Sequence, residues 1–168
     1  KPRPYKTKGQ AVHGAITLFY HFPQKKRTFS NLKKCLAEAW FSEKDPYKEP
    51  PLGKLGGFRD LKEEKKAYLE SLSLLKNFYR MEKESPSLFL VPTAKLRDSF
   101  EDYEKMIKPL NKEFSVSGKF DRIDRLKDGS LRIVDFKTGG NDSDHFQLEF
   151  YKLLAELNFK KKVSKVGF

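Results

Sequence analysis

Cysteine is almost absent from this chain of 168 residues, which contains a single one, Cys35. One cysteine cannot form an intramolecular disulfide, and it cannot build a zinc or iron–sulfur site from cysteine ligands. We therefore expect no iron–sulfur cluster. The shortage of cysteine also favours an intracellular setting.

Long apolar runs are absent as well. No run approaches the roughly 18 residues that span a bilayer, and the basic start at Lys1 is not followed by a secretory apolar stretch. We expect a soluble protein without a membrane partner. The chain starts without methionine and ends on a strand-like run, 163–168, so it is compatible with trimming at either end.

Several other signals are missing. No internal repeat or low-complexity tract is present, and no Gly-Lys-Ser/Thr follows the glycines at 53–57, so ATP use is unsupported. No serine lies in a nucleophile-elbow setting, which argues against acyl transfer. His21 and His145 lack metal-ligand spacing, and we interpret both as surface or structural residues.

Positive charge is abundant. Lysine and arginine number 35 against 23 acidic residues, giving a formal charge of +12. Such a surface attracts polyanions, so nucleic acid is the first partner to consider, although a lysine-rich surface can also serve solubility alone. Hydrophobic residues make up 38% of the chain, enough for a packed core, and the length predicts one domain over 1–168.

The N-terminal part of the chain has the pattern of helices. Apolar residues recur every three to four positions over 9–22, 28–43, 60–81 and, in a shorter stretch, 97–108. Pro23 ends the first helix, and Thr28 or Ser30 is the N-cap of the second. Between them and the third helix, 45–58 holds three prolines and three glycines, which predicts a loop or mobile excursion.

From Glu113 the pattern changes to alternation, which is typical of strands. Asp128-Gly129 separates two strand-like runs and predicts a hairpin, and 144–158 returns to a helical period before a final short strand. The order of elements predicts a mixed α/β core with the hairpin at its centre.

The second hairpin strand carries a possible catalytic pair. Asp135 and Lys137 are two apart on a strand and therefore project to the same face, as a carboxylate for a hard cation and a cation near the attacking water would. The same spacing occurs at Asp60/Lys62, Glu63/Lys65 and Glu64/Lys66. Those copies lie in a charged helix, where the partners diverge by about 200°, and we interpret them as a solvated face.

The first hairpin strand supplies a second carboxylate. Asp121 and Asp135 lie about equally far from the turn, so antiparallel pairing places them opposite one another, where they can share a metal. Asp124 faces the other way and can pair with Arg122 or Arg125. Gly118 allows close approach of another backbone.

Three further residues are candidates on weaker grounds. Gln147 and Tyr151 lie four apart on one helical face and could hold a phosphate or orient Lys137, although Tyr151 also fits the apolar stripe of its helix. His13 lies on the first helix, four residues after Gly9, and a lone helical histidine is more often structural than a ligand.

Together these motifs resemble those of RecB-like nucleases in the PD-(D/E)XK superfamily. Gly-xxx-His at 9–13, Gly-x-x-Asp at 118–121, Asp-x-Lys at 135–137 and Gln-xxx-Tyr at 147–151 occur in the family's order, and the match is most specific over 113–151. The resemblance implies an α/β, restriction-endonuclease-like core in which a central mixed sheet is flanked by helices.

The resemblance also implies roles. His13, Asp121, Asp135 and the backbone carbonyl of Phe136 would bind the metal. Lys137 would assist the water, and Gln147 and Tyr151 would engage the DNA strand near the site. Glu113, just before the first hairpin strand, is a weak additional candidate.

The expected protein is a metal-dependent DNA nuclease that uses Mg²⁺ or Mn²⁺, an exonuclease of DNA repair or recombination acting on single strands or duplex ends. It would lie in the cytoplasm or with the nucleoid. Two alternatives stay open: a catalytically silent module of the same fold that binds nucleic acid or a partner protein, and an RNA nuclease. Retention of all four motifs argues against the silent module.

Overall fold

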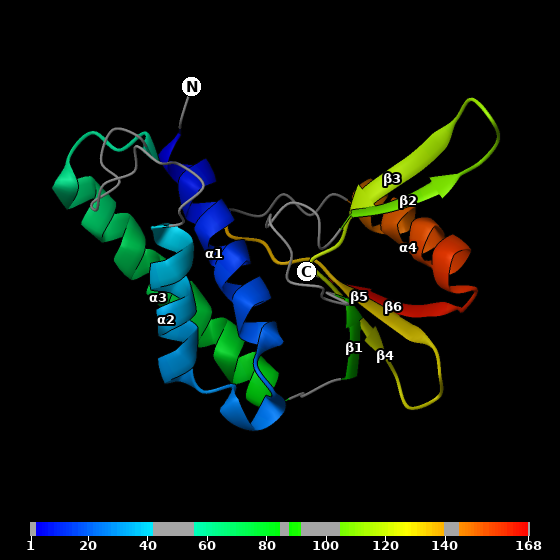
Figure 1. The fold of residues 1–168 in the computed structure, drawn as a ribbon, viewed down its shortest axis with the longest axis horizontal. Coiled ribbons are helices and arrows are strands. Elements are labelled where there is room, and N and C mark those ends of the chain that lie inside the picture. The colour runs from blue at the N-terminus through cyan, green and yellow to red at the C-terminus, as the bar shows by residue number, and fades with distance from the viewer. Residues whose placement is uncertain (1–2, 42–55, 85–87, 92–104, 140–144, 168) are drawn as a thin grey trace. The chain divides into compact units, whose positions relative to one another are not determined.

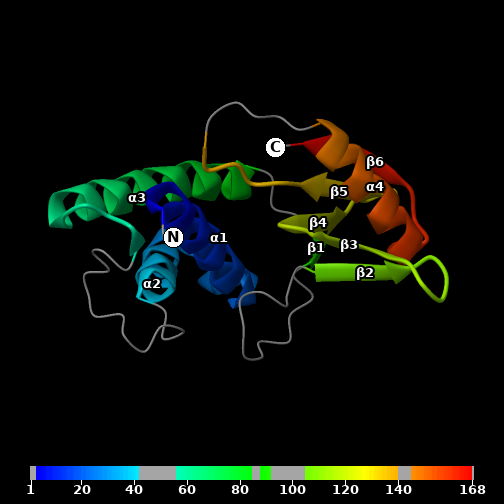
Figure 2. The same ribbon diagram turned by 90° about the horizontal axis from the view of Figure 1, so that it is seen from above.

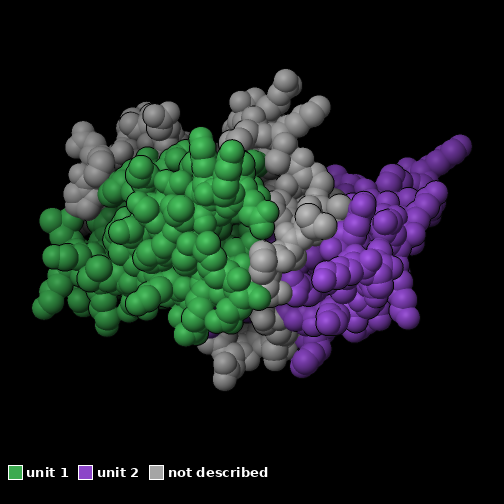
Figure 3. Space-filling view, turned by 90° about the horizontal axis from the view of Figure 1, so that it is seen from below, with its two compact units in different colours: residues 1–85 green, residues 86–168 purple. Residues whose placement is uncertain are grey.

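The computed structural model describes residues 3–41, 56–84, 88–91, 105–139 and 145–167 (Figure 1). The chain forms two compact units, 1–85 and 86–168, which Figure 3 colours separately. The expectation of one domain over 1–168 stays a prediction. None of the described helices is both long and apolar enough to cross a membrane.

The N-terminal unit is helical in its described part. Its elements are α1 (Pro4–His21), the 3-10 turn η1 (Gln24–Lys26), α2 (Phe29–Trp40) and α3 (Leu61–Glu84). The first helix begins five residues before the expected position, because Pro4 occupies its first turn, where a missing N–H costs nothing. Thr28 caps α2 as predicted, accepting a hydrogen bond from the backbone N–H of Asn31 at 3.2 Å.

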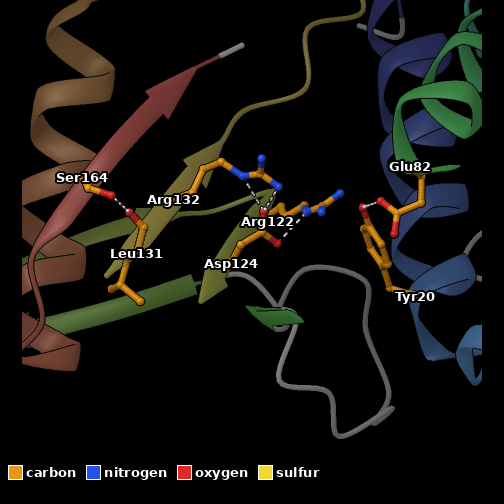
Figure 4. Close-up of polar contacts among 7 residues, drawn as sticks. All are labelled: Tyr20, Glu82, Arg122, Asp124, Leu131, Arg132 and Ser164. Atoms are coloured by element: carbon orange, nitrogen blue, oxygen red, sulfur yellow. Dashed lines mark hydrogen bonds and ion pairs between the residues drawn. The ribbon is translucent and has the colours of Figure 1, made fainter. Parts of the chain in front are cut away.

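Buried polar contacts tie these helices together. The Trp40 indole on α2 donates to Oε1 of Glu64 on α3 at 3.0 Å, and the Tyr20 hydroxyl on α1 donates to Oε2 of Glu82 at 3.1 Å (Figure 4). The expectation that Glu64 belongs to a solvated face is therefore wrong, since its carboxylate is buried and accepts the indole N–H. Of the predicted loop 45–58, residues 45–55 lie outside the described residues, whereas Phe58 is buried and stacks on Trp40.

The C-terminal unit holds two sheets (Figure 2). The four-stranded sheet has the order β1-β4-β5-β6 and is mixed, because β5 and β6 are parallel whereas the other pairs are antiparallel. A separate ribbon pairs β2 with β3. The strands are β1 (Leu88–Val91), β2 (Lys105–Pro109), β3 (Ser115–Lys119), β4 (Arg122–Arg125), β5 (Leu131–Val134) and β6 (Val163–Gly167).

Two predictions about this unit need correction. The helix expected over 97–108 is wrong for 105–108, which form β2 through pairing with β3, while 97–104 lie outside the described residues. The first hairpin strand is also divided, because the chain leaves the ribbon at Lys119 and enters the larger sheet at Arg122. Asp121 lies at this break.

The predicted hairpin is confirmed. β4 and β5 pair antiparallel, with Arg122 opposite Val134 and Arg125 opposite Leu131. Gly129 closes the turn at a φ of +83°, a conformation that glycine adopts without strain.

Helix α4 (His145–Phe159) connects β5 to the parallel strand β6 and packs on the C-terminal unit's core. Its buried side chains Tyr151, Leu154 and Ala155 join a cluster of residues from the strands and the loop before β4. That cluster is completed by Phe120, Ile123, Leu131, Ile133 and Val163. Phe146, in the first turn of this helix, is exposed.

Candidate active site

Two carboxylates lie at neighbouring ends of the central hairpin. Asp121 precedes β4 and Asp135 follows β5, so they flank the last hydrogen-bonded pair, Arg122 and Val134. Asp121 lies two residues from Ile123, and Asp135 lies two residues from Ile133. Both isoleucines belong to the core cluster shared with α4, so the alternation of side chains places the two carboxylates on the α4 side of the sheet. The predicted juxtaposition follows from the observed register.

A short hydrogen bond fixes this end of the hairpin. The backbone N–H of Phe136 donates to Oδ2 of Asp121 at 2.6 Å. The bond ties the chain just after β5 to the carboxylate just before β4. The Asp121 side chain thus holds in place the backbone segment that contains Asp135, Phe136 and Lys137.

Lys137 joins the carboxylates to α4. Its Nζ lies 2.7 Å from Oδ2 of Asp135 and donates to Oε1 of Gln147 at 3.0 Å. Burial lowers the pKa of the Lys137 ammonium, but its hydrogen bond to Asp135 and the charges of Asp135 and Asp121 outweigh that effect and raise the pKa above its usual value. Lys137 is therefore a charged donor in this arrangement.

Tyr151 completes the row of polar contacts. The Lys137 ammonium can only donate and therefore takes Oε1 of Gln147, which leaves the amide Nε2 to donate to the Tyr151 hydroxyl at 3.0 Å. The ring of Tyr151 packs on Phe120 with centroids 4.8 Å apart, and burial raises the pKa of its hydroxyl. The two interpretations of Tyr151 are thus compatible, since its ring belongs to the core and its hydroxyl to the polar row.

Gly118 explains how α4 comes so close. A Cβ at this position would lie 2.8 Å from Cδ2 of Leu154 and 3.2 Å from Cε1 of Tyr151, both shorter than ordinary contacts. Glycine therefore lets α4 approach β3, and this approach carries Gln147 to Lys137. The neighbours that come close to Gly118 are thus two side chains, those of Leu154 and Tyr151, and not another backbone segment.

Two further sequence candidates are carried by other elements. His13 is in the middle of α1, in the N-terminal unit, and its role as a metal ligand stays a prediction. Glu113 is exposed in the turn between β2 and β3, at the opposite end of β3 from Asp121. The structure does not bring Glu113 to the carboxylates.

A second charged cluster lies on the opposite face of the sheet. Asp124 is fully buried and accepts hydrogen bonds from Nε of Arg122 at 2.7 Å and Nε of Arg132 at 2.8 Å (Figure 4). The pairing with Arg122 was expected. The contact with Arg132 was not expected, although the strand register explains it, because Arg132 lies directly opposite Asp124.

The donor set fits a hard divalent cation. Asp121 and Asp135 contribute carboxylate oxygens and Phe136 a carbonyl oxygen, and Mg²⁺ commonly binds one or two carboxylates while water and substrate phosphate complete its shell. Within the described ranges, no group of three or more His, Cys, Asp or Glu side chains is arranged to hold a metal ion.

Comparison with known proteins adds one finding. The family model described as the PD-(D/E)XK nuclease superfamily matches residues 1–167. No curated protein and no solved structure matches the chain. The match, together with the described helices and mixed sheet, confirms the expected α/β, restriction-endonuclease-like fold.

Proposed function

Because the chain belongs to the PD-(D/E)XK nuclease superfamily, a group of metal-dependent nucleases, we propose that it hydrolyses phosphodiester bonds of DNA. The proposed metal is Mg²⁺ or Mn²⁺, and the proposed activity is that of a RecB-like exonuclease in DNA repair or recombination. The family match supports the nuclease class, and the finer assignment rests on the order of the four motifs.

One observation carries the proposal. Asp121, Asp135 and Lys137 converge at the end of a paired hairpin, and Lys137 is held from a separate element by Gln147. The three decoy copies of Asp/Glu-x-Lys around the start of α3 have no such setting. Glu64 binds the Trp40 indole, and Asp60 and Glu63 accept hydrogen bonds from backbone N–H groups at the helix start.

The carboxylates of Asp121 and Asp135 and the carbonyl of Phe136 would hold the metal, with His13 as a further proposed ligand. When bound, a divalent cation lowers the pKa of a coordinated water and offsets charge on the scissile phosphate. The chain's own part is to fix these oxygens, which the bond from the Phe136 N–H to Asp121 achieves.

Lys137 would act as a charged donor that orients the attacking water and stabilises negative charge developing on the phosphate. Gln147 determines where that ammonium points, and Tyr151 fixes the amide of Gln147. Their proposed contribution is therefore positioning of Lys137, in addition to the contact with the DNA strand that the resemblance implies.

The test compares hydrolysis of end-labelled single-stranded DNA, duplex DNA and RNA in Mg²⁺, Mn²⁺ and EDTA. The wild type should cleave DNA in either metal and not in EDTA, and Asp135→Ala should abolish cleavage. Glu149→Ala is the matched control, because Glu149 is an exposed carboxylate on α4 in the same unit. Circular single-stranded DNA, which has no ends, should resist an exonuclease.

Other outcomes would contradict specific parts of the proposal. Cleavage restricted to RNA would overturn the substrate assignment. Binding of nucleic acid without cleavage in either metal would identify a silent module. Equal activity of the wild type and Asp135→Ala would show that the site lies elsewhere.

A further inference from the structure

The ribbon of β2 and β3 presents two different faces. Val116 and Gly118 pack toward the core and α4, whereas Ser115, Ser117 and Lys119 are exposed at every second position. Ile107 lies opposite Ser117 and is also exposed, at 52%. The face turned away from α4, defined here as the ribbon face, therefore includes Ile107, Ser115, Ser117 and Lys119.

The turn that ends the ribbon is ordered and carries exposed apolar side chains. Oδ1 of Asn111 accepts from the backbone N–H groups of Glu113 and Phe114 at 2.9 and 2.8 Å, and the N–H of Leu110 donates to the carbonyl of Phe114 at 2.9 Å. Phe114 is nevertheless 64% exposed and Leu110 58%. Neighbouring exposed apolar side chains on a fixed turn are typical of a contact surface.

The chemistry of this surface matches one strand of nucleic acid. Serine hydroxyls and lysine ammonium groups are common phosphate contacts, and an exposed aromatic ring offers a face on which a base can stack. Lys108 and Lys112 add positive charge to the ribbon and its turn, which contain one acidic residue, Glu113. The charge balance favours a polyanion over an apolar protein partner.

The ribbon face also leads to the candidate active site. Lys119 ends β3 two residues before Asp121, so the row of exposed donors ends beside the break at which the chain passes from the ribbon to the larger sheet, and the strand would cross the chain there to reach the carboxylates. From Asp121 to Phe114 the chain has seven steps, at most roughly 23 Å at about 3.3 Å per residue, because the chain leaves the ribbon after Lys119. A stacked strand rises about 3.4 Å per nucleotide, so this length corresponds to about seven nucleotides.

We propose that the ribbon face and Phe114 form the path of one nucleic-acid strand, with phosphates along Ser115, Ser117 and Lys119 and a base stacked on Phe114. This inference rests on the proposed function and extends it. The strand is held about seven nucleotides from the scissile phosphate. The affinity of the protein for an oligonucleotide therefore rises with oligonucleotide length until the strand is long enough to reach Phe114.

The test measures binding of labelled oligothymidylates, about four and about sixteen nucleotides long, by fluorescence anisotropy in Ca²⁺, with a gel to verify that the DNA is intact. Phe114→Ser should weaken binding of the longer strand by about tenfold, the order expected for one lost base stack, and leave the shorter strand unchanged. Ser117→Asp should also weaken the longer strand, because it places a negative charge among the phosphates.

Leu153 provides the matched controls, because it is 54% exposed on α4 in the same unit. Leu153→Ser removes a similar exposed apolar side chain, and Leu153→Asp adds the same charge. Neither should change binding at either length. Phe114 and Ser117 are exposed, so their variants should keep the wild-type melting temperature.

The outcomes separate this inference from the proposed function. If the wild type cleaves DNA but Phe114→Ser and Ser117→Asp bind both lengths as it does, the strand path is wrong and the nuclease assignment stands. If Phe114→Ser instead changes only the oligomeric state in light scattering, the turn is a contact between copies of the chain. If the wild type neither binds nor cleaves nucleic acid, both proposals fail.

Discussion

The Nζ of Lys137 donates to Oε1 of Gln147 at 3.0 Å, joining the chain just after a hairpin strand to a helix ten residues later. The same ammonium lies 2.7 Å from Oδ2 of Asp135. Lys137 is thus held between a carboxylate on its own segment and an amide on α4. Its position depends on both elements.

Gln147→Ala should lower nuclease activity by about ten- to hundredfold, as loss of an orienting contact commonly does. It removes the acceptor for Lys137 and the donor to Tyr151. Gln147→Glu keeps an acceptor in the same place and should retain more activity. Steady-state rates at equal melting temperatures provide the measurement, and wild-type rates for Gln147→Ala would show that Lys137 needs no such support.

Gly118→Ala should destabilise the fold by about 1–3 kcal/mol, the usual cost of adding a methyl group to a packed interface. The new Cβ would lie 2.8 Å from Cδ2 of Leu154 and 3.2 Å from a ring carbon of Tyr151. Urea unfolding measures the change. Gly167→Ala is the control, since a Cβ there meets nothing within 4 Å, and an equal loss in both variants would contradict the packing explanation.

Asp124→Ala should cost about 3–5 kcal/mol of unfolding free energy, because it leaves the buried Arg122 guanidinium without its carboxylate. The replacement also removes the partner of Arg132. Glu149→Ala, which removes an exposed carboxylate, should stay within about 0.5 kcal/mol of the wild type. Similar urea midpoints for the two variants would show that the buried cluster adds no stability.

Cys35 should react with a thiol reagent at pH 8 far more slowly in the folded protein than in urea. It is buried in α2, and burial, together with the nearby charge of Glu38, raises the pKa of its thiol from 9.0 to about 11. The reactive thiolate is therefore scarce at pH 8. Leu153→Cys adds an exposed thiol as an internal standard, and equal reaction rates for the two thiols would refute the assignment.

The raised pKa of the Cys35 thiol also predicts that the free energy of unfolding depends on pH. Folding raises the pKa of Cys35, so the folded state holds the thiol proton more tightly. This contribution is fully present below pH 9.0 and is lost as the pH rises through about 11. The urea midpoint of the wild type should therefore fall between pH 9 and pH 11, and Cys35→Ala should lack the part of this fall that comes from the thiol. The same pH profile in both proteins would contradict the raised pKa of Cys35.

Much of the site could be predicted from the sequence because it depends on local rules. Asp128-Gly129 specifies a turn, and the turn specifies the register that sets Asp121 across from Asp135. The strand expected to carry Asp135 and Lys137 ends at Val134, so both lie just beyond it, yet the ammonium of Lys137 lies 2.7 Å from Oδ2 of Asp135. Each step involves residues close together in the chain, where backbone geometry leaves few alternatives.

Other features were decided by contacts between distant segments. The sequence does not predict β1 or β2, nor the division of the first hairpin strand at Asp121, because these depend on which strand each segment pairs with. The burial of Glu64 against Trp40 likewise reverses its expected exposure.

The sequence by itself determined the kinds of residues at the candidate site and the hairpin register that sets Asp121 across from Asp135, since turn chemistry and strand pairing act locally. The sequence left open whether Gln147 holds a phosphate or orients Lys137, and tertiary structure decided that Gln147 binds Lys137. That contact requires α4 to pack closely on β3, and the packing is possible because Gly118 carries no side chain.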